Sequence, residues 1–288
     1  MQLDLFSHGR DVMLQNDVAA ALRKRNLEGA RKALESFTAE FPHHETISLA
    51  TTLLATLASP AKPSLNRAEV AARICEIDAA LVPAAERIFG RDEAPKWLSP
   101  VWSSLANAAT RWSFDPGYPS AHAGSLYLRS SDWAAAEQHI KTIPSWRRIP
   151  GPLAWMIEAC FHRHGLESVW HLLIELAWLE SDVFRALASR LSSEPLMRLW
   201  HRFETGLGSE ADLDARWFPA WLLITAPKMA SVMRGAQACS GKAPERAARL
   251  MMELLLLEKQ GRHAELVAHR RRLRDLCPEL YEYYMATR

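Results

Sequence analysis

The chain has 288 residues, of which 49% are hydrophobic and 24% are charged. This composition is typical of globular domains, so disorder is not the default expectation. Its formal charge of +2 is too small to indicate a nucleic-acid partner by itself. The first residues lack the pattern of a secretory signal, and no apolar run approaches the ~20 residues of a membrane-spanning helix. We therefore expect a cytoplasmic protein without a membrane partner.

The cysteines are spread singly through the chain, without a Cys-x-x-Cys pair. They are Cys75, Cys160, Cys239 and Cys277. A chain of this length does not depend on disulfides, and isolated cysteines suit a reducing compartment. We expect buried thiols, because unpaired cysteine behaves mostly as a small apolar residue.

Helix signals dominate the sequence, and alternating strand patterns are nearly absent. Apolar residues recur at spacings of three and four in successive segments, as in amphipathic helices. The expected helices are Val12–Leu22, Leu27–Phe41, Ile47–Leu57, Val70–Leu81, Ser120–Tyr127, Trp133–Ile140, Leu153–Phe161, Leu166–Leu179, Leu196–Phe203, Ala247–Leu257 and Ala264–Leu276. Asn66 and Glu69 form a capping-box pattern ahead of one of them. The sequence predicts an all-α fold.

A loop rich in proline and glycine, Phe114–Pro119, is the strongest candidate for a boundary along the chain. It divides expected N-terminal helical repeats, residues 1–113, from C-terminal repeats, residues 114–288. A repeat stack can absorb such a loop without forming two domains. One continuous array therefore remains an alternative.

Four segments share a pattern in which a turn is followed by a small residue and by apolar residues at helical spacing. They cover residues 26–42, 124–143, 165–176 and 261–278. In the second copy, the small Gly124 allows two helices to approach closely, while Tyr127 and Trp133 fill the space between them. Leu166 of the third copy follows Trp133 by 33 residues.

This pattern resembles the tetratricopeptide repeat (TPR), a pair of antiparallel helices of about 34 residues with small residues where the helices cross. The resemblance is closest over residues 120–179. It implies helix-turn-helix repeats stacked as a degenerate TPR-like α-solenoid. Another type of α-solenoid, or an irregular helical array, remains compatible with the sequence.

The resemblance also implies a function, because members of this family hold peptide segments of other proteins on a concave face. We expect a non-enzymatic scaffold or adaptor that binds a partner protein or peptide and needs no small-molecule cofactor. Alignment of the copies places these residues on the concave face: Gln15, Arg23, Ser125, Arg129, Glu158, His162, Glu258 and Lys259. Their mixed charge indicates a partner recognised through hydrogen bonds and single charges.

One cluster of side chains supports an alternative hypothesis, in which the protein is an all-helical enzyme or a metal protein. Its members are Cys160, His162, His164, Glu167, His171 and Glu175. Glu167, His171 and Glu175 recur every four residues and so share one helix stripe, opposite the apolar stripe of the same expected helix. The ligand set is incomplete for a metal site. We expect a solvated helix face, with no metal and no catalytic residue.

A second cluster, the arginine-rich segment Arg270–Arg274, supports a nucleic-acid-binding helical array as another alternative. Successive helical positions point around the helix, so these arginines should form a charged solvent face and not a single stripe. The chain also has eleven tryptophans, most of which should lie in the core. Trp146, in an expected loop, is a candidate anchor for a partner.

Overall fold

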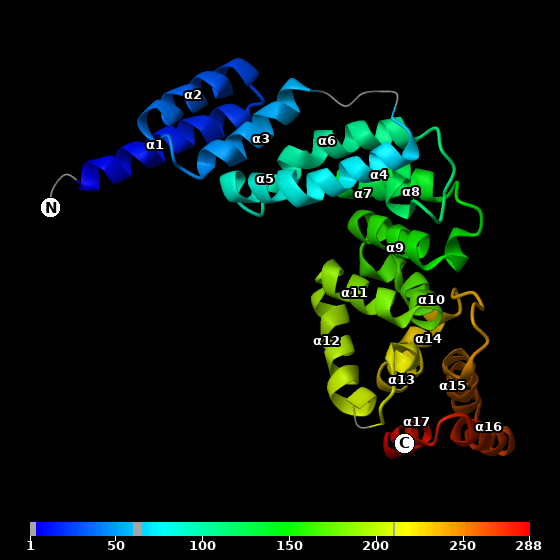
Figure 1. Ribbon diagram of the computed structural model, residues 1–288. Helices are drawn as coiled ribbons and strands as arrows, with labels where there is room; N and C mark the ends of the chain where they lie inside the picture. The colour runs from blue at the N-terminus through cyan, green and yellow to red at the C-terminus, as the bar shows by residue number, and fades with distance from the viewer. Residues whose placement is uncertain (1–3, 60–64, 210) are drawn as a thin grey trace. The chain divides into compact units, whose positions relative to one another are not determined.

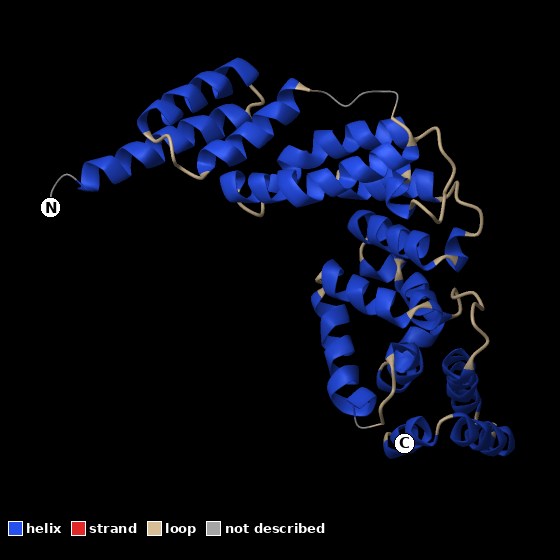
Figure 2. Ribbon diagram, in the orientation of Figure 1, coloured by secondary structure: helices blue, strands red, loops and turns tan. Residues whose placement is uncertain are grey.

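The computed structural model describes residues 4–59, 65–209 and 211–288. All regular structure in these residues is helical, as the sequence predicts (Figures 1 and 2). No helix of the described chain has the length and apolar character needed to cross a bilayer.

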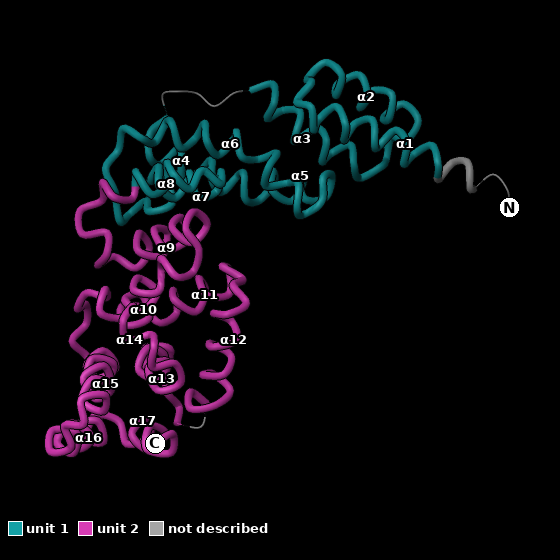
Figure 3. The backbone as a smooth tube through the Cα atoms, turned by 180° about the vertical axis from the view of Figure 1, so that it is seen from behind, with its two compact units in different colours: residues 1–139 teal, residues 140–288 magenta. Residues whose placement is uncertain are grey.

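The chain forms two compact units, residues 1–139 and 140–288 (Figure 3). The division falls near the end of α8 (Trp133–Ile140). The Phe114–Pro119 loop, which we expected to be a boundary, lies inside the first unit. It is held there because Arg67 pairs with Asp115 at 3.0 Å.

The first unit contains seven helices ahead of α8: α1 (Asp4–Arg23), α2 (Leu27–Glu40), α3 (Thr46–Ala58), α4 (Arg67–Glu76), α5 (Val82–Phe89), α6 (Ala94–Ala109) and α7 (Ala123–Arg129). A π-helical segment, Ile77–Leu81, joins α4 to α5. The expected capping box is confirmed: the Asn66 side chain accepts from the Glu69 N–H, and the Glu69 carboxylate accepts from the Asn66 N–H.

Neighbouring helices of the first unit pack in sequence order. Helices α1 and α2 form a hairpin, α3 packs on α2 and α5, and α6 packs on α5 and α7. Leu14, Val18 and Leu22 of α1 are spaced by one turn and are all buried, which explains the helical periodicity seen in the sequence. Gly124 is also buried, within α7.

The second unit contains α9 (Pro150–His164), α10 (Trp170–Leu179), α11 (Ser181–Leu191), α12 (Glu194–Phe203), α13 (Phe218–Thr225), α14 (Ala230–Met233), α15 (Ala243–Gln260), α16 (His263–Leu276) and α17 (Pro278–Ala286). An aromatic cluster in its core joins α11, α12 and α13. Neighbouring ring centroids in this cluster lie 5.4–5.9 Å apart, and its members are Phe184, Trp200, Phe203, Phe218 and Trp221. Such contacts favour one specific packing of these helices.

The sequence patterns did not predict several helices, namely α5, α6, α11, α13, α14 and α17. Helix α13 is buried over Phe218–Ile224, so no polar face marks its period. Helix α6 carries Pro95 and an internal Pro100, and proline within a helix weakens the helical signal of the sequence. The expected helix Leu166–Leu179 also differs from the structure, because Leu166–Ser168 forms a 3₁₀ turn before α10 begins.

Candidate functional site

A groove of about 550 Å³ lies between α3, α4 and α6 of the first unit. We call it the α3–α4–α6 groove. Apolar side chains form much of its wall, among them Leu57, Ala72, Val101 and Leu105. Ligand sites in proteins span about 300 to 1,000 Å³ and combine apolar walls with a few polar groups. By size and lining, this groove fits that description.

Most charged side chains of the groove are already engaged on their own helix. Glu69 accepts from the Asn66 N–H at 2.6 Å, as part of the capping box of α4. Arg73 donates to the Glu76 carboxylate at 2.8 Å. The charged side chains that α4 presents to the groove are thus all engaged by partners on α4 or at its N-cap.

Arg25, from the turn between α1 and α2, is the exception. Its guanidinium lies over the Trp97 ring, 4.9 Å from the ring centroid, and donates to the Trp97 carbonyl. No ion pair joins it to a carboxylate of the described residues. Desolvation lowers the pKa of Arg25, whereas the hydrogen bonds that Arg10 donates to Glu40 raise the pKa of Arg10. Arg25 nevertheless stays ionised, since arginine is charged at any physiological pH.

The Arg25 backbone is also unusual, with φ at +54°. The Asn26 N–H bonds to the Ala21 carbonyl, and the Arg25 N–H to the Leu22 carbonyl. This pair of bonds is a Schellman motif, which places Arg25 at the left-handed position that glycine usually fills. An L-residue there costs roughly 1–2 kcal/mol.

Trp97 fixes this turn against α6. Its indole N–H donates to the Leu22 carbonyl at 2.8 Å, and its ring lies 5.4 Å from that of Phe89. Because Trp97 is almost fully buried, it forms a rigid support under the Arg25 guanidinium.

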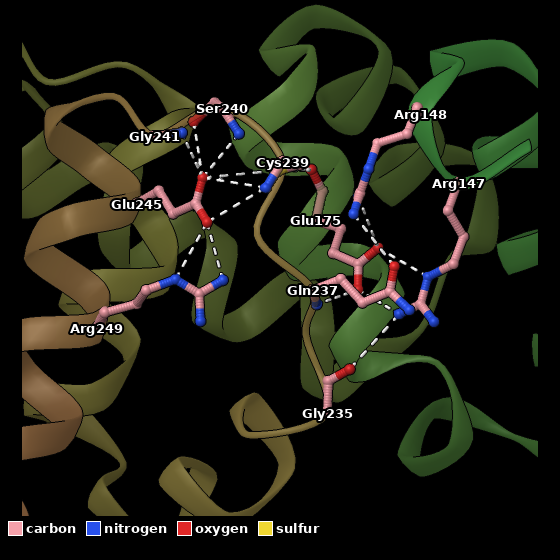
Figure 4. A network of polar contacts seen from close by, with 10 residues as sticks. All are labelled: Arg147, Arg148, Glu175, Gly235, Gln237, Cys239, Ser240, Gly241, Glu245 and Arg249. Carbon is pink, nitrogen blue, oxygen red and sulfur yellow. Dashed lines mark hydrogen bonds and ion pairs between the residues drawn. The ribbon is translucent and has the colours of Figure 1, made fainter. Parts of the chain in front are cut away.

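The second unit contains a buried carboxylate network around the loop of residues 234–242 (Figure 4). Glu175 of α10 is completely buried. It accepts from Arg147 at two oxygens and from the Gln237 N–H at 2.7 Å, and Arg148 lies 3.9 Å away. These contacts tie the loop to α10.

Glu245 of α15 holds the other half of the same loop (Figure 4). It accepts from the N–H groups of Ser240 and Gly241 at 2.7 and 2.8 Å, and from Arg249 at 2.8 Å. Burial alone would raise the pKa of Glu245, but these hydrogen bonds to the charged form outweigh it and bring the pKa to about 2. Glu245 is therefore ionised, and both glutamates accept from several donors.

Cys239 lies between the two glutamates, yet the network does not activate it. Burial, together with the charges of Glu245 and Glu175, raises the pKa of Cys239 to about 11. Its thiol therefore stays protonated at neutral pH and is a poor nucleophile. The network serves to hold the loop.

The expectation that Glu167, His171 and Glu175 form a solvated helix face is wrong in part. Glu167 is exposed and His171 is half-buried, but Glu175 is completely buried. The reason is that α10 is buried from Leu172 to Trp178, so this segment has no solvent face. Among the described residues, no three His, Cys, Asp or Glu side chains are grouped to hold a metal ion.

Two of the predicted partner-binding residues of the first unit are exposed. Arg23 lies 5.7 Å from the centroid of the Phe89 ring. Arg129 pairs with Asp78 at 2.5 Å and stacks on Trp102 at 4.6 Å. Arg129 is therefore accessible but already engaged.

The other two predicted residues of the first unit are covered to different degrees. Gln15 is half-buried and contacts the His44 ring nitrogen at 3.0 Å. Ser125 is buried, and its hydroxyl lies 2.7 Å from the Ser120 carbonyl. The expectation that Ser125 faces a partner is wrong, because α7 is buried from Ala123 to Leu128.

The remaining predicted residues, Glu158, His162, Glu258 and Lys259, belong to the second unit. His162 and Lys259 are exposed. Glu158 is half-buried and pairs with Arg190 at 2.7 Å. Glu258 is also half-buried and accepts from Tyr284 and from Arg288. Arg129 and Glu158, expected to face one groove, thus lie in different units.

As expected, the arginines of α16 do not form a single stripe, and Arg271, Arg272 and Arg274 are exposed. Arg270 donates to the Tyr284 hydroxyl, whereas Arg272 lines a second groove, of about 680 Å³, between α15 and α16. Arg246 and Arg249 line the same groove. Sequence reasoning missed these two, because they come from the neighbouring helix.

The expectation for cysteine is wrong at one position. Cys277 is buried and Cys160 and Cys239 are half-buried, but Cys75 is exposed, because it lies outside the buried stripe of α4. The expectation for tryptophan is confirmed, since six of the eleven are buried. Trp146 is half-buried in a short 3₁₀ turn.

Sequence reasoning also missed Arg25. No local signal marks it, because positive φ at an arginine has no sequence signature and Trp97 is distant along the chain. Only the structure shows that the Arg25 guanidinium lies both at the groove and over the Trp97 ring. No protein-family model, no curated protein sequence and no solved structure matches the chain.

Proposed function

We propose that this protein is a non-enzymatic scaffold or adaptor that binds a peptide segment of a partner protein. The α3–α4–α6 groove carries this proposal, because it combines an apolar wall with a charged rim at a size suited to peptide side chains. Its glutamates are engaged in helix capping and in an ion pair. That arrangement favours binding over acid–base chemistry.

We also propose that the helices form a degenerate TPR-like α-solenoid. The first and last repeat copies support this, since each begins at a tight turn between two helices, α1–α2 and α15–α16. The free thiols favour a reducing compartment such as the cytoplasm.

The test begins with selection of peptides that bind the protein from a display library of random linear peptides. Binding of the selected peptides is then measured with a variant whose groove is blocked. Ala72 lines the groove and is exposed, so Ala72→Trp should fill the groove without disturbing the core. Ala39→Trp, at an exposed position of α2 outside the groove, is the matched control. We expect Ala72→Trp alone to abolish binding of the selected peptides. Peptides that bind both variants equally would reject the groove as the site.

A second candidate function is binding of single-stranded nucleic acid at the groove between α15 and α16. Arg246 and Arg272 favour it, because clustered guanidiniums supply the phosphate-dependent part of such binding. Measurement of oligonucleotide affinity at increasing salt tests it. Steep loss of affinity with salt, together with loss in Arg272→Ala, would support this function.

A further inference from the structure

Two arginines and two glutamates line the α3–α4–α6 groove, so its formal charges balance, but they are not evenly paired. Arg73 and Glu76 form an ion pair, and Glu69 accepts from the N–H of Asn66, the N-cap residue of α4. Arg25 forms no ion pair with a carboxylate of the described residues. The Arg25 end of the groove is therefore complementary to a ligand with one acidic group beside apolar parts.

The Arg25 guanidinium is held in place but retains free donors. Stacking on Trp97 fixes its plane, and the Trp97 carbonyl accepts from only one of its nitrogens. The remaining N–H groups form a fork of the kind that binds a carboxylate with two hydrogen bonds. Because Trp97 is buried and tied to the Leu22 carbonyl, little side-chain entropy remains to be lost on binding.

The backbone supplies an independent observation. The other non-glycine residues with positive φ in the described chain are short and polar: Ser131, Ser145, Ser192 and Asp212. Arg25 is the one long side chain at such a position among these residues. The Schellman motif at the end of α1 explains the positive φ itself. Glycine usually fills that position, and no ion pair with a carboxylate of the described residues explains an arginine there.

We propose that Arg25 anchors a carboxylate of the bound peptide, so that the groove selects segments in which an Asp, a Glu or a C-terminus lies beside apolar side chains. This inference rests on the proposed peptide-binding function. The apolar side chains enter the wall formed by Leu57, Val101 and Leu105, and the acidic group meets the Arg25 fork.

The test uses peptides selected on the full chain, fluorescently labelled and titrated by anisotropy. We expect enrichment of acidic residues beside apolar ones, and a roughly tenfold or greater loss of affinity in Arg25→Gly. Glycine suits the left-handed position, so this variant should keep its fold. Arg25→Lys keeps the charge and loses the fork, and should show an intermediate loss.

Two controls make the result specific. Lys24→Gln removes an exposed cation next to Arg25 that does not line the groove, and should leave affinity within about twofold. Changing the peptide's acidic residue to its amide should cause the same loss as Arg25→Gly, with no further loss when both changes are combined.

The outcomes separate the two proposals. Peptides blocked by Ala72→Trp that show no acidic preference and no response to Arg25→Gly would reject the Arg25 anchor and keep the groove. Absence of any peptide blocked by Ala72→Trp would reject the groove function itself. If dodecanoate binds more tightly than every selected peptide and depends on Arg25, a small amphipathic acid replaces the peptide as occupant and the proposal is wrong.

Discussion

Arg25 of the first unit and the arginines beside Glu175 and Glu245 of the second unit take opposite roles. In the second unit, Arg147 and Arg249 each complete the hydrogen bonding of a buried carboxylate, Glu175 and Glu245. In the first unit, Arg25 lies at a groove with an aromatic ring and a carbonyl as its partners. The same side-chain chemistry is thus structural in one region and available for a ligand in the other.

The difference shows which partner sets the role of an arginine. A buried carboxylate must be fully paired, since an unpaired buried charge is very unfavourable. Its arginine partners are therefore committed to the fold. An arginine at the edge of an open groove stays partly hydrated, and can remain without a carboxylate until a ligand arrives.

The largest expected effect is at Glu175. Glu175→Ala leaves Arg147 and the Gln237 N–H without their shared acceptor, and should lower the free energy of unfolding by about 3–5 kcal/mol. Urea denaturation measures this change. Glu167→Ala, at an exposed position, should change it by less than about 0.5 kcal/mol. Equal stabilities of the two variants would contradict the structural role of the network.

At Glu245 the expected effect depends on pH. The native pKa of about 2 lies below the ordinary value of ~4.3, so the unfolded chain takes up a proton first as the pH falls. Glu245 therefore stabilises the fold above about pH 5 and loses that contribution as the pH falls toward 2.

The measurement is urea denaturation at about pH 6 and about pH 3. Wild type should lose roughly 2 kcal/mol more than Glu245→Gln between these values. Glu282→Gln, at an exposed position of the same unit, is the control and should keep the wild-type dependence. An unchanged slope in Glu245→Gln would reject the assigned network.

Arg129 should have a smaller effect. Its ion pair with Asp78 is about as exposed as surface pairs usually are, with side-chain exposures of 38% and 44%. Arg129→Ala removes this pair and the stacking on Trp102, and should lower the free energy of unfolding by about 1 kcal/mol. Thermal melting checks this value. A loss as large as that of Glu175→Ala would remove the distinction between exposed and buried pairs.

The smallest effect on stability is expected at Arg25, where two contributions oppose one another. Arg25→Gly relieves the left-handed backbone, by roughly 1 kcal/mol, and loses the stacking and hydrogen bond to Trp97, by a similar amount. The free energy of unfolding should change by less than about 1 kcal/mol. Urea denaturation of Arg25→Gly and of Glu175→Ala under the same conditions compares the loss of stability in the two regions. Severe destabilisation would show that Arg25 is structural.

The sequence by itself determined the elements whose cause is local. Periodic apolar residues predicted α1, α2 and α3, and the bounds of α8 agree fully with the prediction. The capping box at Asn66 and Glu69 was also readable, because its residues lie three apart and bond within one turn. These features need no knowledge of distant neighbours.

Only the tertiary structure decided the environment of Glu175, Ser125 and Arg25. Periodicity assigns a polar face to a helix that has one free side, but α7 is buried from Ala123 to Leu128 and α10 from Leu172 to Trp178. Ser125 and Glu175 are therefore buried against expectation. Arg25 meets Trp97 across 72 residues of chain. Pairing over such separations depends on how the helices pack together, and local sequence patterns do not encode that packing.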